Sequence, residues 1–120
     1  MAKKPGVQVR RVYEAADERD GIRVLVDRLW PRGLTKIQAA LDEWCKDVAP
    51  STELRKWYGH DPTKFTEFTR RYRIELGQGE QSTALQHLRD LAIDHRLTLL
   101  TGTTEPAISE AAVLADILNH

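Results

Sequence analysis

The stretch RVLVDRLWPRG, residues 23–33, decides the fold that we predict for this chain. Its apolar side chains Val24, Leu25 and Val26 point alternately to the two faces of a strand, so both faces are apolar. Such a run is typical of a strand that is covered on both sides, as in a layered α/β domain. Pro31 ends the strand, because proline has no amide donor and restricts the residue before it.

The rest of the chain supplies further strands and helices around this one. We expect strands at residues 7–13, 22–27 and 97–101, and helices that begin near Thr35, Ser51, Asp61-Pro62, Ser82 and Pro106. The Thr35 helix shows a capping box with Gln38, followed by Ile37, Ala40, Leu41 and Trp44 at helical spacing. Neither a linker nor a repeat interrupts the pattern. We predict one small α/β domain over residues 1–120, with a short, partly parallel sheet and helices packed against it.

Composition and charge limit the kinds of partner that we expect this chain to bind. Basic and acidic side chains both number 18, so no global field draws the chain to nucleic acid or to a membrane. Residues 1–60 carry 12 basic and 9 acidic side chains, so we expect any anion site in this half. No apolar run is long enough for a membrane span and no apolar leader follows the N-terminus. With a single cysteine, Cys45, these features predict a cytoplasmic protein without membrane contact.

The segment DRLWPRG is the candidate ligand site. In open α/β sheets ligands bind beyond the carboxyl ends of parallel strands, and this loop and TGTTEP each follow a strand. Arg28 and Arg32 can present their donors to a carboxylate or phosphate, with Asp27 orienting one of them. The structural alternative is that Asp27 pairs with an arginine, Trp30 packs at the core edge and Pro31 shapes the turn. Both interpretations stay open on the sequence.

Other polar groups extend this candidate site. His60 can serve as an acid or base, as Asp27 can, or it can simply bond the last carbonyls of a helix. Lys46 and Trp57, with Trp30, are further ligand-binding candidates, although aromatic residues at helical spacing are more often core. The same groups can stack bases and contact phosphates, which gives a nucleic-acid-binding alternative. We predict no metal site, and the sequence identifies no cofactor and no oligomeric state.

Three motifs carry a resemblance to a known family. DRLWPRG, APSTELRKW and GHDP occur in order, within a match that runs from residue 7 to residue 118. With LTLLT before a final helix, the chain resembles the YeaO-like branch of the domain-of-unknown-function 488 family. The resemblance implies a small α/β cytoplasmic bacterial protein without an agreed substrate. It also implies a role in fold or site for the residues on motif positions, namely Asp27, Arg28, Arg32, Lys46, Trp57 and His60.

One segment departs from the family pattern. YeaO-like proteins usually have a His-Asn pair after the last strand, where this chain has Ile108 and Ser109. An isoleucine side chain neither exchanges protons nor binds metal, so an activity that needs that histidine is in question here. The sequence leads us to expect a protein that binds a small anionic ligand, phosphorylated or carboxylate, at the arginines after strand two. The alternative is a non-enzymatic module for nucleic-acid or protein interaction, and the question of catalysis stays open.

Overall fold

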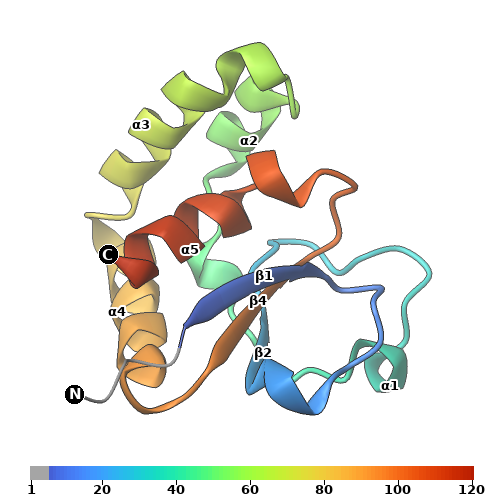
Figure 1. Ribbon diagram of the computed structural model, residues 1–120. Helices are drawn as coiled ribbons and strands as arrows, with labels where there is room; N and C mark the ends of the chain where they lie inside the picture. The colour runs from blue at the N-terminus through green and yellow to red at the C-terminus, as the bar shows by residue number, and fades with distance from the viewer. Residues whose placement is uncertain (1–5) are drawn as a thin grey trace.

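The structure is a computed structural model that describes residues 6–120, and its centre is a parallel sheet (Figure 1). Within these residues the sheet has four strands in the order β1-β4-β2-β3. The strands are β1 (Val7–Arg11), β2 (Ile22–Leu25), β3 (Glu43–Trp44) and β4 (Leu97–Thr101). The helices are α1 (Lys36–Ala39), α2 (Thr52–Tyr58), α3 (Phe65–Glu75), α4 (Gly79–Asp94) and α5 (Glu110–Asn119). All neighbouring strands run parallel, which confirms the α/β fold class.

Both faces of the sheet are covered, as the apolar run in β2 predicts. On one face Val24 and Leu99 belong to the main core, which α2 to α5 complete. On the other face Leu25 and Leu100 pack in a smaller core against the segment that contains α1. The register pairs Leu25 with Leu100, so the alternation of the two central strands is in phase. The carboxyl ends of β2 and β4 therefore meet at one edge.

The ends of α2 follow the predicted capping signals. The Ser51 hydroxyl accepts a hydrogen bond from the Leu54 amide at 3.1 Å, which satisfies an otherwise unpaired donor in the first turn. Gly59 closes the helix in the left-handed conformation, with φ of 52°. His60 also has a positive φ, 55°, which is uncommon for a residue with a side chain. Two successive left-handed residues turn the chain sharply after α2.

The helix predicted after Thr35 is shorter than the sequence pattern indicates. The capping box between Thr35 and Gln38 is present, but α1 ends after one turn because Ala40 takes the left-handed conformation. Trp44, which we expected on this helix, lies in β3 and donates its indole N–H to the Asp27 carbonyl at 2.7 Å. Ile37 is 91% exposed. Pairing with β2 thus outweighs helical spacing in this segment.

No helix among residues 6–120 has the length and apolar character that crossing a membrane requires. The largest helices, α3 and α4, are amphipathic and bury their apolar sides in the main core.

Candidate functional site

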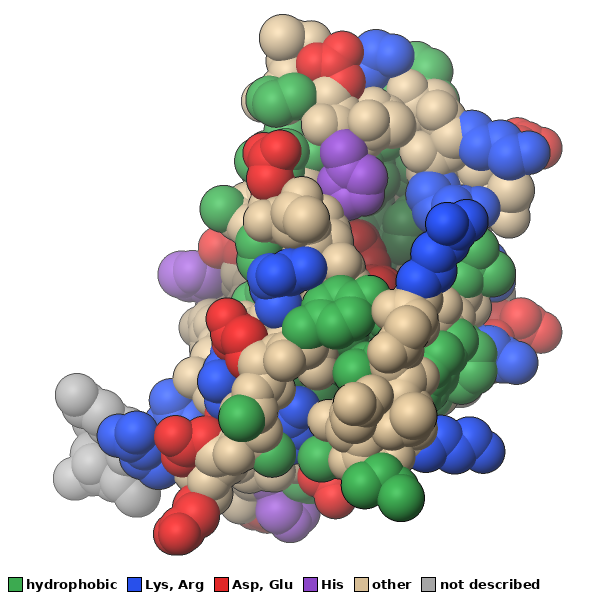
Figure 2. Space-filling view, turned by 90° about the vertical axis from the view of Figure 1, so that its right-hand side faces the viewer, with side chains coloured by type: hydrophobic (Ala, Val, Ile, Leu, Met, Phe, Trp, Pro, Cys, Tyr) green, Lys and Arg blue, Asp and Glu red, His purple; other side chains and the backbone are tan. Residues whose placement is uncertain are grey.

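A pocket of about 230 Å³ lies at the carboxyl edge of the sheet. Its lower wall is formed by the residues after β2 and β4, and its upper wall by the end of α2 and the start of α5. The face shown in Figure 2 is hollowed near its centre, where acidic side chains lie deep between a histidine and basic side chains. This is the position at which parallel α/β sheets generally bind ligands.

Two strand-end loops join at the floor of the pocket. The Asp27 Oδ2 atom accepts a hydrogen bond from the Gly102 amide at 2.8 Å, so the loop after β2 is tied to the loop after β4. A Cβ atom at Gly102 would lie 3.3 Å from that Asp27 oxygen and 3.4 Å from Pro31, so glycine permits this close approach. The expectation that both loops project from the same edge is confirmed.

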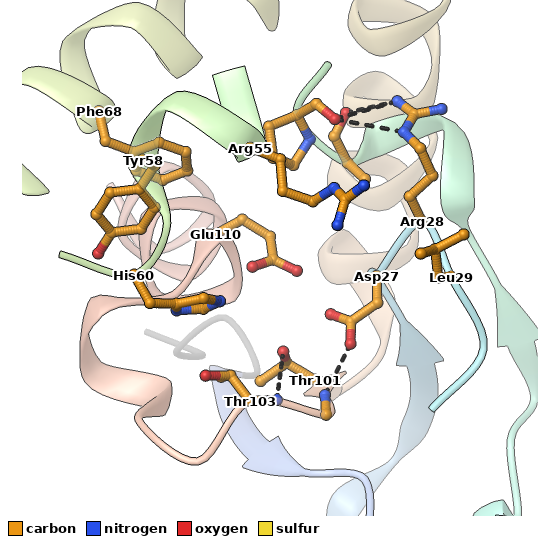
Figure 3. A pocket seen from close by; sticks show the side chains of 13 residues that line it. Asp27, Arg28, Leu29, Arg55, Tyr58, His60, Phe68, Thr101, Thr103 and Glu110 are labelled. Atoms are coloured by element: carbon orange, nitrogen blue, oxygen red, sulfur yellow. Dashed lines mark hydrogen bonds between the residues drawn. The ribbon is translucent and has the colours of Figure 1, made fainter. Parts of the chain in front are cut away.

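A pair of acidic side chains lies inside the pocket. Asp27 comes from the loop after β2, and Glu110 is the first residue of α5, placed there by the Ser109 cap. Figure 3 shows both carboxyl groups directed into the same space. Burial raises the pKa of Glu110 well above its usual range, and its interaction with Asp27 raises the pKa further, against the opposing charge of Arg55. The pocket therefore favours the neutral, protonated form of the Glu110 carboxyl.

Basic groups complete the lining. Arg55 stands on an exposed position of α2, and its guanidinium points into the pocket toward both carboxyl groups (Figure 3). His60, after α2, faces the same space. Arg28 lines the pocket differently, because its guanidinium donates to the carbonyls of Ala49 and Pro50 at 3.1 to 3.4 Å. Arg28 thus braces the wall, while Arg55 presents its charge to the interior.

Aromatic side chains make the apolar part of the lining. Tyr58 stacks on Phe68 with ring centroids 4.2 Å apart, and its hydroxyl donates to the Ile108 carbonyl at 2.6 Å. Burial, and secondarily the negative charge of Glu105, raises the pKa of Tyr58 to about 12, so this hydroxyl stays neutral. The bond from Tyr58 also fixes the turn that leads into α5. Where the family pattern has a His-Asn pair, positions 108 and 109 here supply a backbone acceptor and a helix cap.

The structure brings together only part of the predicted site. Asp27, Arg28 and His60 line the pocket. Arg32 is exposed and outside this lining, and its carbonyl accepts a hydrogen bond from the Tyr13 hydroxyl. The two-arginine clamp with Arg32 is therefore not assembled.

The predicted aromatic and lysine ligands lie elsewhere, in contacts with other side chains. Trp30 donates to the Leu34 carbonyl and packs edge-on against Trp44, with centroids 5.4 Å apart. The Lys46 ammonium lies over the Trp44 ring. Trp57 contacts the cations of Lys64 and Arg71, at 5.1 and 4.2 Å from its ring centre. These arrangements agree with the structural alternative for Trp30 and Trp57.

The sequence analysis missed Arg55, Tyr58 and Glu110. Arg55 and Tyr58 are three residues apart on α2, a spacing that places both on one side of a helix and was available from the sequence. Glu110 directly follows the helix-capping Ser109, at the mouth of a strand-end loop. Glu110 lines the pocket and Glu105 does not, because of the way α5 packs over the sheet. No local pattern in the sequence indicates this packing.

The described residues offer no grouped metal ligands and one buried thiol. Within residues 6–120 the structure brings no three His, Cys, Asp or Glu side chains together as a metal site needs. Cys45 is buried, and this burial raises the pKa of its thiol to about 11. The group is therefore a poor nucleophile at neutral pH.

The fold and the pocket define a small parallel α/β protein with a mixed-charge pocket at its sheet edge. The chain belongs to the DUF488-N3i family, described as the inactive DUF488-N3 subclade, whose profile matches residues 6–120. Uncharacterised proteins of Mycobacterium tuberculosis and Mycobacterium bovis are each 50% identical over 119 residues, which is 99% of this chain and 98% of theirs. The uncharacterised protein YeaO of Escherichia coli is 46% identical over 112 residues, covering 93% and 96%. No solved structure matches the chain.

Proposed function

We propose that the pocket binds a small anionic ligand and that Arg55 is its principal charged contact. The observation that carries this proposal is the convergence of Arg55, Arg28 and His60 on one pocket at the carboxyl edge of the sheet. Arg55 can offer its planar donors to a carboxylate or phosphate, and His60 can add a hydrogen bond from the opposite wall. Arg28 keeps the wall in place through the Ala49 and Pro50 carbonyls.

In this proposal the protein binds its ligand without converting it. The description of the subclade as inactive supports a binding role, as does the isoleucine at position 108. The catalytic roles predicted for His60 and Asp27 are not part of the proposal. A cytoplasmic location and the bacterial setting of the family remain predictions from the sequence.

The volume of the pocket limits the size of the ligand that it can enclose. A cavity of about 230 Å³ is smaller than the roughly 300 to 1,000 Å³ typical of sites that enclose drug-sized ligands. It suits a molecule of a few heavy atoms around one anionic group. Among the ligands expected from the sequence, a small phosphorylated or carboxylated metabolite therefore fits better than a whole nucleotide.

Thermal unfolding in the presence of simple anions tests this role. Wild type, Arg55→Ala and the control Lys56→Ala, a neighbouring exposed residue of α2 outside the pocket lining, are compared with inorganic phosphate, acetate and small phosphate esters. Ligand at a hundred times its dissociation constant stabilises the fold by about 2.7 kcal/mol, which raises the midpoint by several degrees. The shift should occur in the wild type and in Lys56→Ala and be lost in Arg55→Ala.

A different pattern would favour the interaction-module alternative. Binding of short nucleic acids that weakens steeply with salt and does not depend on Arg55 would indicate contacts with several backbone phosphates. That result, without any anion shift, would overturn the proposed pocket function.

A further inference from the structure

The pocket presents the guanidinium of Arg55 to its interior. In Figure 3 the Arg28 guanidinium is hydrogen-bonded to neighbouring carbonyls, whereas that of Arg55 has no hydrogen-bond partner among the residues drawn. The Asp27 carboxylate lies in the same pocket, where its negative charge helps to raise the pKa of Glu110. Arg55 can balance a ligand with one negative charge, but Asp27 would repel a second charge. The pocket therefore favours a monoanion, and the guanidinium fork matches the two oxygens of a carboxylate.

The rim of the pocket carries an exposed apolar side chain, that of Leu29. Leu29 lies in the loop after β2, lines the pocket and is 63% exposed. Ala49 and Pro50, on the wall that Arg28 braces, add further apolar atoms to the lining. An apolar ligand group that covers Leu29 removes apolar surface from water, which favours binding. The lining therefore suits a ligand with an apolar part beside its charge.

We propose that the ligand is a small monocarboxylate with an apolar chain, whose carboxylate pairs with Arg55 and whose chain lies against Leu29. This inference rests on the anion-binding role proposed above and adds the head group and the tail of the ligand. Arg55 and Leu29 line the same small pocket, so a short chain can reach from one to the other. Phosphate monoesters are mostly dianions near neutral pH and bring a second negative charge toward Asp27.

Acetate, butyrate and propyl phosphate test the head group and the tail separately. Acetate and butyrate share the carboxylate and differ by two methylene groups, whereas butyrate and propyl phosphate share the propyl chain and differ in the head group. Their affinities for the wild type are measured by chemical-shift titration at pH 7.5 and constant ionic strength. Each buried methylene group strengthens binding about fourfold, so butyrate should bind about fifteenfold more tightly than acetate. Butyrate should also bind more tightly than propyl phosphate, which Asp27 repels.

Two variants test the contacts at the two ends of the ligand. Arg55→Ala removes the guanidinium and should abolish the binding of both carboxylates. Leu29→Ala shortens the apolar side chain at the rim, so the ratio of butyrate to acetate affinity should fall by at least about threefold. Because Leu29 is exposed, this variant should keep its fold, which circular dichroism checks. The control Ile93→Ala truncates a similarly exposed residue of α4 outside the pocket lining and should keep the wild-type ratio.

The outcomes separate this inference from the function on which it rests. If acetate and butyrate bind with equal affinity and both are lost in Arg55→Ala, the anion site stands and the apolar tail is overturned. Propyl phosphate that binds more tightly than butyrate, again through Arg55, overturns the monocarboxylate. A butyrate preference that is unchanged in Leu29→Ala also overturns the inference. If no probe binds the wild type, or Arg55→Ala binds them normally, the proposed function and this inference fall together.

Discussion

Replacing Glu110 by glutamine should stabilise the protein increasingly as the pH rises. The folded protein keeps a proton on Glu110, whereas the unfolded chain releases it above its ordinary pKa of 4.5. The unfolded state thus binds fewer protons, and the contribution of Glu110 to stability falls as pH rises toward the raised pKa of the folded state. This sign is opposite to that of a carboxylate in an ion pair. Glutamine has no titrating proton, so the free energy of unfolding of the variant does not decrease with pH in this way.

The size of the effect follows from proton linkage. Each pH unit in which the folded state holds one proton more than the unfolded chain changes the free energy of unfolding by about 1.4 kcal/mol. From pH 5 upward the free energy of unfolding of the variant should therefore rise relative to that of the wild type, for as long as the folded wild type keeps the Glu110 proton. Below pH 4.5 the two should be nearly equal, because the neutral amide has the shape of the protonated acid and can donate to Asp27.

Urea unfolding at pH 4, 5, 6, 7 and 8 measures this difference directly. Glu105→Gln serves as the control, because it removes a negative charge from an exposed residue of the same loop region. Its difference from the wild type should not follow pH in this way. A Glu110→Gln difference that stays flat from pH 5 to pH 8, or a variant that is less stable at every pH, would refute the buried, protonated Glu110 carboxyl.

Three further predictions concern the fold around the pocket. Tyr72→Phe removes the donor to the buried Val48 carbonyl and should lower the free energy of unfolding in urea by about 1 to 2 kcal/mol; no change would mean that water replaces this bond. Gly21→Ala should lower the free energy of unfolding by about 3 kcal/mol or more, because φ is 66° and an added Cβ atom would collide with the Arg96 carbonyl oxygen. A variant with the melting temperature of the wild type would contradict this local geometry. Cys45 should resist iodoacetamide at pH 8, as followed by mass spectrometry, since it is buried and its thiol pKa is raised to about 11; labelling at the rate of a free thiol would argue against this burial.

Much of the fold could be predicted because the strongest signals are local. The two-sided apolar run in β2 and the caps of α2 each depend on a few neighbouring residues, and the structure bears them out. The two-residue β3 could not be found in this way. Its pairing with β2 depends on the left-handed Ala40, which ends α1 early and redirects the chain, and alanine carries no signal for that conformation.

The sequence predicted the part of the candidate site that directly follows the sheet strands, but not the part that lies on helices. Asp27 could be placed because parallel strands end at one edge, a rule that needs only the strand positions. Arg32 was grouped with Asp27 on the sequence, but four residues beyond Arg28 the turn carries its side chain outside the lining of this pocket. Arg55 and Glu110 come from helices that arrive over the edge from distant parts of the chain. Their positions depend on tertiary packing that residue spacing does not specify.

Positions 108 and 109, where the family pattern has a His-Asn pair, hold the start of α5 in this chain. Ile108 offers its backbone carbonyl to the Tyr58 hydroxyl, and the Ser109 side chain accepts from the Ala112 amide to start α5. Both contacts fix the first turn of α5, whose first residue is Glu110. A protonated carboxyl that is held beside Asp27 can donate a hydrogen bond.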